Sequence, residues 1–484
     1  MLDLTKKFIA IGCLLALASY ANCNPILCKQ YVDNEQFEKA YQYCLDAVKQ
    51  GDARSQYYLG VVYSNEKSSH YDLEEAADLI VQSAEQDYML AQYRLGEIYR
   101  TGKGVPQDYE KSAYWYRKAA NKQDGLSQYK LANLYSDGLG VEKDLQKAVN
   151  YYSLAAEQGV SEAQHNLGVF YDEGRHVKQD YEKSVYWYSK AAAQGFAESQ
   201  NNLGGMYSNG LGVDQDPVKA VYWYQQAANQ GNDQAQYNLA LRFYNGVGAP
   251  KDLNTAISWF TKAAEQGFVV AQYNLGTIYI AEEKNIEQSL YWFRKAADQD
   301  YPMALFYLGS IYSKGLGVPT DIKAAVDYFS KAADLGEPNS QHTLGNILIR
   351  GARVEKNSSR AFQLFTDAAN QEFGPAQNSL GVMYMLGDGI PKDEEKAFFW
   401  FSKSAKNGDS QGQYSLGSTY IRMKKVSAED AITAYAWINC SIKSGNIAGV
   451  ALRDKIQAVM TQSQLLRATE LSDELFEKYS LAKQ

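Results

Sequence analysis

The sequence has few prolines and few histidines, and it has no long hydrophobic run beyond its N-terminal region. Only 9 of its 484 residues are proline, which is compatible with a chain made of stacked helices. Its four histidines include no His-x-x-x-His pair on a predicted helix, which argues against a zinc site of that kind. Asp and Glu (56) outnumber Lys and Arg (48), so the charge balance argues against nucleic acid or anionic lipid as a ligand.

The signatures of common catalytic sites are missing as well. Several Gly-x-Gly elements, such as the one at Gly102, follow predicted helices rather than strands and lack the lysine of a phosphate-binding loop. We interpret them as turns. We also expect no strand-to-helix nucleophile elbow. The sequence therefore predicts no catalytic residue, no cofactor and no metal site.

One stretch recurs along most of the chain. In Ala91–Gln123 it reads AQYRLGEIYRTGKGVPQDYEKSAYWYRKAANKQ, and its anchor is a leucine followed by glycine or alanine. Nine of the ten spacings between successive anchors are 36 residues, and one is 33. A fixed period of this length is typical of a solenoid, in which each unit buries its apolar face against its neighbours. The anchors are Leu59, Leu95, Leu131, Leu167, Leu203, Leu239, Leu275, Leu308, Leu344, Leu380 and Leu416.

Each unit predicts two helices joined by a glycine-rich turn. Ala91, Leu95 and Ile98 fall at helical spacing, and Gly102 then ends the first helix. In seven repeats an aspartate such as Asp108 precedes the second helix, where its carboxylate can cap the backbone N–H groups. A tryptophan column and a glutamine column recur in the same register. We interpret both as structural positions.

The stretch AQYRLGEIYRTGKGVPQDYEKSAYWYRKAA resembles the SEL-one-like repeat (SLR), a relative of the tetratricopeptide repeat with a longer unit. The resemblance runs from about Asp52 to Ser444. It implies an all-α fold, namely a right-handed α/α superhelical solenoid of antiparallel helix pairs. It also implies a scaffold for protein–protein contacts and no reaction.

We divide the chain into four parts. Residues 1–21 are a predicted signal peptide, 22–51 a degenerate helical hairpin that caps the array, 52–444 eleven repeats, and 445–484 C-terminal capping helices. The seventh repeat lacks three residues and both turn glycines, which predicts a local kink or a flattened groove. The repeats are 52–87, 88–123, 124–159, 160–195, 196–231, 232–267, 268–300, 301–336, 337–372, 373–408 and 409–444.

The N-terminal segment predicts export. Two lysines precede an apolar run over residues 8–18, and small side chains stand before a cleavage point after Ala21. The run is too short to cross a bilayer, so we interpret it as a secretory signal peptide. We expect a periplasmic or secreted protein with no membrane span. Lipid anchoring at Cys23 is the alternative, although the residues before it make a poor lipobox.

Two positions on each predicted first helix are not explained by packing: the residue before the anchor leucine and the residue two places after it. They share one helix face, and first helices line the concave side of a right-handed superhelix, so they predict a groove. Amides there could bind an extended peptide backbone, or they could be structural. The candidate groove residues are Arg94, Lys130, Asn166, Asn202, Asn238 and Asn274 before the leucines, and Glu97 and Asn133 after them.

These features favour a non-enzymatic scaffold or adaptor that binds protein or peptide partners. We expect it at the bacterial envelope or the host interface, where a role in virulence is one form its function could take. One alternative is a peptidoglycan-active or β-lactam-binding enzyme, because some cysteine-rich members of the family have been described in that way. Another is a structural element of the envelope without a dedicated ligand.

The cysteines predict one disulfide. Cys23, Cys28, Cys44 and Cys440 would remain after removal of the signal peptide, and an exported chain permits bridges. We expect Cys28 and Cys44 to join the first hairpin, with Cys23 as the competing partner and Cys440 as a buried free thiol. Peptide mapping of the non-reduced protein should recover Cys28 and Cys44 in one crosslinked pair. Alkylation of both thiols would contradict this pairing.

Overall fold

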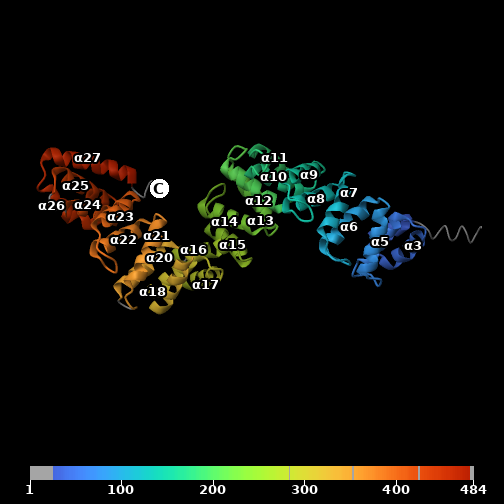
Figure 1. The fold of residues 1–484 in the computed structure, drawn as a ribbon, viewed down its shortest axis with the longest axis horizontal. Helices are drawn as coiled ribbons and strands as arrows, with labels where there is room; N and C mark the ends of the chain where they lie inside the picture. Colours follow the sequence, from blue (N-terminus) through green and yellow to red (C-terminus); the bar gives the residue numbers. More distant parts are fainter. Residues whose placement is uncertain (1–24, 283, 352–353, 423–425, 480–484) are drawn as a thin grey trace, which may run out of the picture. The chain divides into compact units, whose positions relative to one another are not determined.

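A computed structural model describes residues 25–282, 284–351, 354–422 and 426–479. Within these ranges the chain forms α-helices and one 3₁₀-helix, without a β-strand, and consecutive helices pack in pairs. Figure 1 shows these pairs following one another in chain order within each of two compact units, which meet in the sequence between Trp259 and Phe260. The all-α solenoid of helix pairs is therefore confirmed. The predicted signal peptide (1–21) and Cys23 lie outside the described residues.

The N-terminal unit begins with the cap hairpin and continues through repeats one to five into repeat six. Its helices are α2 (Pro25–Asp33), α3 (Phe37–Lys49), α4 (Ala53–Tyr63), α5 (Leu73–Glu85), α6 (Met89–Thr101), α7 (Tyr109–Ala120), α8 (Gly125–Asp137), α9 (Leu145–Glu157), α10 (Ser161–Glu173), α11 (Tyr181–Ala193), α12 (Ala197–Asn209), α13 (Pro217–Asn229) and α14 (Asp233–Asn245). The division between the units falls inside α15 (Leu253–Glu265).

The C-terminal unit holds the remaining repeats and the C-terminal cap. Its helices are α16 (Val269–Ala281), α17 (Ile286–Ala297), α18 (Pro302–Lys314), α19 (Ile322–Asp334), α20 (Pro338–Arg350), α21 (Ser358–Asn370), α22 (Gly374–Leu386), α23 (Glu394–Lys406), α24 (Ser410–Ile421), α25 (Ala428–Lys443), the 3₁₀-helix η1 (Ile447–Gly449), α26 (Val450–Gln457) and α27 (Gln462–Tyr479). The kink or flattened groove expected at repeat seven (α16 and α17) stays a prediction. No helix in the described ranges is both long and apolar enough to span a bilayer.

The turn glycines have two separate roles. The first glycine of a turn ends the first helix in the left-handed conformation, as Gly138 does after α8 with φ of 75°. The second glycine approaches the preceding repeat. At Gly140, an added Cβ atom would lie 2.1 Å from the backbone carbonyl oxygen of Tyr109, at the start of α7. The turn is therefore also a contact between repeats, and it excludes side chains at that point.

The predicted aspartate caps are confirmed. Asp144, for example, accepts a hydrogen bond of 2.9 Å from the backbone N–H of Lys147 at the start of α9. This bond, together with the ammonium group of the same lysine, holds the pKa of the Asp144 carboxyl below its usual value. The same hydrogen bond from a backbone N–H of the first turn of the helix is made to Asp108, Asp180, Asp216, Asp252, Asp321 and Asp393.

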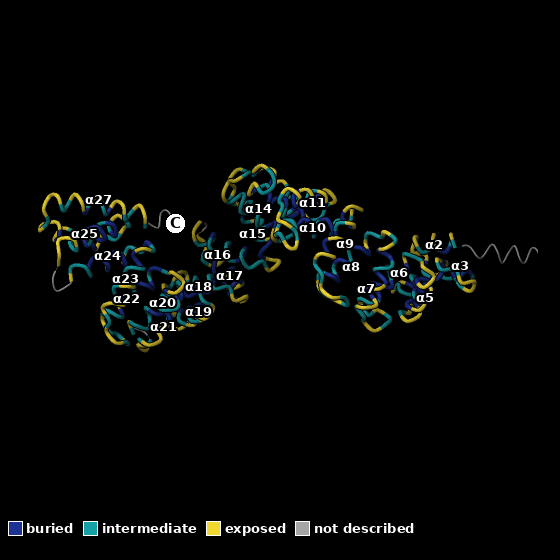
Figure 2. The backbone as a smooth tube through the Cα atoms, turned by 45° about the horizontal axis from the view of Figure 1, so that its top comes forward, coloured by how far each residue is buried: buried dark blue, intermediate teal, exposed yellow. Residues whose placement is uncertain are grey.

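The core of repeats two to ten is an aromatic ring packed on the small residue after the anchor leucine, and in repeats one and eleven Ile80 and Ile438 take the place of the ring. In repeat two, the Tyr116 ring covers Gly96 so closely that an added Cβ atom would lie 2.5 Å from the ring. Both the ring and Leu95 are fully buried. Figure 2 shows the buried residues along the packed helices and the exposed ones mainly at the turns. The ring therefore fixes how closely the two helices of a pair approach.

A buried amide relay joins consecutive repeats through the glutamine column. The side-chain N–H of Gln128 donates to the Ala120 carbonyl at the end of α7, at 3.3 Å. Its Oε1 atom accepts from Gln158, which follows α9, at 2.7 Å. One amide on α8 thereby links the C-terminal ends of α7 and α9, where backbone carbonyls lack partners inside their own helix. Equivalent relays occur at Gln164, Gln200, Gln272 and Gln341.

The N-terminal cap is tied to the array in two ways. The Cys28 and Cys44 sulfur atoms are joined in a disulfide between α2 and α3, with the Cα atoms 5.0 Å apart. The turn of repeat one has lost its glycines, and it contacts α3 instead: Lys67 pairs with Glu35 at 2.8 Å. In the same turn, His70 stacks on Tyr41 with ring centroids 3.6 Å apart. This polar turn is therefore held by the cap.

The C-terminal cap differs in part from the prediction. A single helix was expected from Asn446 to Met460, but the structure divides it into η1 and α26, because the Asn446 side chain caps a 3₁₀ turn first. The capping box of the last helix is present, with reciprocal hydrogen bonds between Thr461 and Gln464. Helix α27 covers α25, where Tyr479 stacks on Trp437. Cys440 is free and buried, as expected.

Two neighbouring glycines of α12 provide a direct test of the ring contact. A Cβ atom at Gly204 would lie 2.8 Å from the Tyr224 ring, whereas at Gly205 its nearest neighbour would be the Tyr224 hydroxyl at 3.8 Å. We expect Gly204→Ala to lower the free energy of unfolding by about 1–3 kcal/mol through overpacking. Gly205→Ala should raise it by about 0.5–1 kcal/mol, because alanine favours a helix. Urea unfolding followed by circular dichroism measures both, and equal effects of the two substitutions would contradict the packing argument.

Candidate functional site

The first-helix face is the surface formed by the two predicted groove positions, one before and one two places after each anchor leucine. In the C-terminal unit, the first helices of successive repeats contact each other, α16 with α18 and α22 with α24. In the N-terminal unit, hydrogen bonds join α10 to α12 and α12 to α14. The predicted groove residues are all half-buried on this face: Arg94, Glu97, Lys130, Asn133, Asn166, Asn202 and Asn238 in the N-terminal unit and Asn274 in the C-terminal unit.

The asparagines of this face contact protein groups rather than one another. Asn133 accepts a hydrogen bond of 2.6 Å from the Tyr152 hydroxyl, which lies within hydrogen-bonding reach of Asn166 as well. Asn202 approaches the Tyr188 hydroxyl in the same way. Burial raises the pKa of both tyrosines, so their hydroxyls stay protonated donors.

In α12 and α14, Asn202 and Asn238 are connected through a third asparagine. Asn238 donates to Asn201, at 3.0 Å, and Asn201 in turn approaches Asn202 at 3.4 Å. Asn201 was not a candidate residue, although the sequence shows that it occupies the same position in its repeat as His165, one 36-residue period earlier. His165 makes a similar bond to the next repeat, with Nδ1 2.9 Å from the Ser199 hydroxyl. This column therefore connects successive first helices.

Charged candidates gather around one carboxylate in repeats two and three. Glu97 accepts hydrogen bonds from Arg100, at 2.7 Å, and from the Tyr116 hydroxyl, and its carboxylate lies 3.5 Å from the Lys130 ammonium group. Burial alone would raise the pKa of Glu97, but these donors and positive charges outweigh it and lower the pKa. Lys130 is therefore an ion-pair partner of Glu97. Arg94, one helical turn before Glu97, takes no part in this cluster.

The floor of the first-helix face differs between the two units. In the N-terminal unit the buried core ring of repeats two to five is a tyrosine, and its hydroxyl reaches polar groups of the first helix. The Tyr224 ring, for example, lies 5.8 Å below the guanidinium of Arg242, which also donates to Ser208 at 2.7 Å. In the C-terminal unit the ring is phenylalanine. The tyrosines are Tyr116, Tyr152, Tyr188 and Tyr224, and the phenylalanines are Phe260, Phe293, Phe329, Phe365 and Phe401.

A second surface, which was not predicted, lies on the second helices. In several repeats, the residue before the tryptophan of the second helix is an aromatic that is about half exposed, such as Tyr186 at 52%. At four of the five positions a lysine four residues later covers the ring: the Lys190 ammonium group lies 5.2 Å from the Tyr186 centroid, whereas Tyr222 is followed by Gln226. The members are Tyr114, Tyr186 and Tyr222 in the N-terminal unit and Tyr291 and Phe399 in the C-terminal unit. We call this the second-helix aromatic column.

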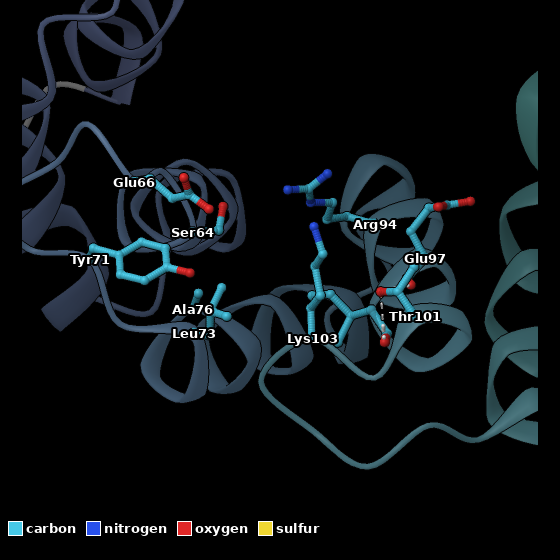
Figure 3. A pocket seen from close by; sticks show the side chains of 10 residues that line it. Ser64, Glu66, Tyr71, Leu73, Ala76, Arg94, Glu97, Thr101 and Lys103 are labelled. Atoms are coloured by element: carbon cyan, nitrogen blue, oxygen red, sulfur yellow. Dashed lines mark hydrogen bonds between the residues drawn. The ribbon is translucent and has the colours of Figure 1, made fainter.

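The best-enclosed depression on the N-terminal unit lies between the turn of repeat one and α6. Its volume is about 210 Å³. Figure 3 shows Arg94 and Lys103 extending into it from one side, with Glu66 and Tyr71 on the other. The carboxylate of Glu97 points away from Arg94, toward its partners Arg100 and Lys130. The sequence singled out Arg94, but it did not place Lys103 beside it.

One Gly-x-Ser-x-Gly stretch does occur, at Gly408–Gly412, but it has no elbow geometry. It connects α23 to α24 rather than a strand to a helix. Asp409 is the N-cap of α24 and accepts the backbone N–H of Gly412 and the hydroxyl of Ser404. Burial raises the pKa of the Asp409 carboxyl. The stretch is a helix start.

The architecture is that of an α-helical repeat scaffold, a class of protein that contacts its partners over an extended surface. The Sel1 repeat model matches residues 53–88, 90–124, 125–160, 161–196, 197–232, 233–268, 269–301, 302–337, 338–373 and 374–409. The chain belongs to the Sel1 repeat family. The matched residues include all but the last of the eleven predicted repeats.

Solved structures share the fold. The crystal structure of c5321, a protective antigen present in uropathogenic Escherichia coli strains, is 36% identical with a TM-score of 0.74, and the match covers 90% of this chain and 94% of that one. A Sel1 repeat protein from Oxalobacter formigenes is 32% identical with a TM-score of 0.52, covering 63% of this chain and 89% of that one. Comparison with curated proteins gave no match.

The Glu97 cluster predicts a pH-dependent contribution to stability. The folded-state pKa lies below the ordinary value of 4.5, so the ionised carboxylate stabilises the fold above that pH. The stabilisation is lost as the pH falls from 4.5 through the folded pKa. We expect Glu97→Gln to lower the free energy of unfolding by about 1–3 kcal/mol at pH 7, and the difference from the unchanged protein to shrink below pH 4.5.

Urea unfolding at pH 7 and at pH values below 4.5 measures this difference. Glu110→Gln is the matched control, because Glu110 is exposed at the start of α7 and its substitution removes the same charge. It should have little effect at either pH. A Glu97→Gln effect that stays constant over the whole pH range would show that the ionised carboxylate is not its source.

Proposed function

We propose that this protein is a non-enzymatic, exported bacterial scaffold that binds protein or peptide segments along its first-helix face. The observation that carries the proposal is the polar lining of that face in the N-terminal unit. Amides, buried hydroxyls and charged groups line successive first helices there, for example Asn133 over Tyr152 and Ser208 beside Arg242. Such groups bind a polypeptide backbone through donors and acceptors that do not depend on its side chains.

The contacts of the asparagines with tyrosine hydroxyls do not remove them from binding. An amide has two donor hydrogens and an acceptor oxygen, and Asn133 uses its oxygen for Tyr152. The hydrogen bonds instead hold the amide in one orientation, which lowers the entropy cost of binding. Binding would be spread over several repeats, with affinity concentrated in a few residues.

Export is part of the same proposal. It is supported by the charged and apolar N-terminal segment of the sequence, residues 1–21, and by the Cys28–Cys44 disulfide, since disulfides persist in oxidising compartments. The E. coli relative is described as a protective antigen, which supports a host-facing setting for a bacterial member of the family.

Crosslinking in the native cell, followed by mass spectrometry, tests the proposal. The tagged protein should capture defined polypeptides, and changing Asn166, Asn202, Asn238 and Asn274 together to alanine should reduce their recovery at least about tenfold. That corresponds to about 1.4 kcal/mol, roughly one or two lost hydrogen bonds.

The matched control changes the other surface. Tyr114, Tyr186 and Tyr222 replaced by alanine should leave recovery unchanged, because the second-helix aromatic column lies on different helices. Circular dichroism establishes that both variants are folded. Unchanged recovery with the asparagine variant, or loss confined to the tyrosine variant, would remove the first-helix face as the binding surface.

A further inference from the structure

The depression between repeats one and two contains two cations that no carboxylate neutralises. Within the described part of the chain, neither Arg94 nor Lys103 forms a salt bridge. The neighbouring cations Arg100 on α6 and Lys130 on α8 both pair with Glu97. The Nε atom of Arg94 is shielded from solvent and has no hydrogen-bond partner among the described residues. A shielded guanidinium donor without an acceptor is uncommon, because its desolvation is not compensated.

The surroundings keep these two cations available. Glu97, the nearest carboxylate in sequence, is occupied by Arg100, Tyr116 and Lys130. Lys67 in the opposite turn is occupied by Glu35 of the cap. Glu66 is the remaining carboxylate of the lining, and it lies across the opening from Arg94 (Figure 3). The lining therefore holds two cations, Arg94 and Lys103, and two carboxylates, of which Glu97 is already engaged by Arg100 and Lys130, in a chain whose formal net charge is −8.

The combination occurs once among the repeats. At the position equivalent to Arg94, repeat one has Tyr58 and repeats four to seven have asparagine. At the position equivalent to Lys103, repeat three has Leu139 and repeat five has Leu211. The turn of repeat one, which has lost its glycines and is held against the cap, forms the opposite wall. The depression is therefore a local departure from the repeat pattern rather than a consequence of it.

We propose that this depression is a binding site for the side chain of an aspartate or glutamate in a bound polypeptide segment. The inference rests on the proposed function and names the chemistry of its partner at one end of the face. An Arg guanidinium binds a carboxylate through two parallel N–H donors, and Lys103 adds a point charge. The volume of about 210 Å³ is below the roughly 300–1,000 Å³ of pockets for whole small ligands, and it suits a single side chain.

Its position suits an extended ligand. Arg94 belongs both to the depression and to the column that continues as Lys130 and Asn166 on the following first helices. A segment whose acidic side chain enters between Arg94 and Lys103 can therefore continue along the face, where Asn133 and the tyrosine hydroxyls meet its backbone. The acidic residue would set the register of the segment, and the amides would hold the rest.

The test uses the full chain and an array of random decapeptides with amidated C-termini. Peptides captured by the unchanged protein should be enriched in Asp and Glu, and the best binders should lose at least tenfold in affinity by fluorescence anisotropy when that residue is replaced by its amide. Arg94→Ala should abolish the enrichment and weaken the acidic peptides at least tenfold. It should leave their amide versions unaffected.

Three further variants sharpen the result. Arg94→Lys should recover only part of the affinity, because it keeps the charge and loses the paired donors. Glu66→Gln should strengthen binding, because it removes a competing carboxylate. Arg175→Ala is the matched control, since it removes the same charge from an exposed position in the turn after α10, and it should change nothing.

The outcomes separate the two proposals. Capture of peptides without enrichment in acidic residues, or an enrichment that survives Arg94→Ala, overturns the acidic-residue site and leaves the scaffold function standing. Binding that needs a free C-terminus, tested by resynthesising the same peptides without the amide, overturns the assignment to a side chain. No capture of any peptide overturns both proposals.

Discussion

The structure depends on one buried interaction that repeats along the chain, the glutamine amide that links three consecutive helices. Helix ends leave backbone carbonyls without partners, and in a stack of short helices these ends meet at every repeat. The amide of Gln128 donates to the end of one helix and accepts from the residue that closes another, so one side chain joins the ends of two successive second helices. Together with the contact between the second turn glycine and the preceding repeat, it holds neighbouring repeats in register.

The ring on the small residue complements this relay within each repeat. Because the Tyr116 ring touches Gly96 directly, the two helices of a pair lie close, and the para position of the ring reaches the first-helix face. A tyrosine hydroxyl there hydrogen-bonds to polar groups of the face, and phenylalanine offers no such group. The change from tyrosine to phenylalanine between repeats five and six therefore alters the chemistry of the binding surface without altering the fold. The two units therefore differ in the aromatic residue beneath the first-helix face, which is tyrosine in one and phenylalanine in the other.

Much of the fold could be predicted from the sequence, because the determinants are local and recur at a fixed spacing. Helix pairs, turn glycines and aspartate caps need only the contacts of residues a few places apart, and the 36-residue period supplies the rest. The site was harder. Pairing of Lys130 with Glu97, the bond from Asn238 to Asn201 and the position of Lys103 beside Arg94 all depend on how one repeat rotates on the next. The period gives no measure of that rotation, and at the C-terminus, where it ends, the expected single helix proved to be two.

The relay has a consequence for the conditions under which the protein holds together. Its members are neutral amides, which neither titrate nor attract counterions, so this particular link between repeats does not depend on pH or on ionic strength. The proposed binding of a carboxylate by Arg94 and Lys103 would depend on both conditions, because salt screens the attraction and acid protonates the carboxylate. The amide links between repeats would therefore persist under conditions in which the proposed hold on an acidic partner weakens.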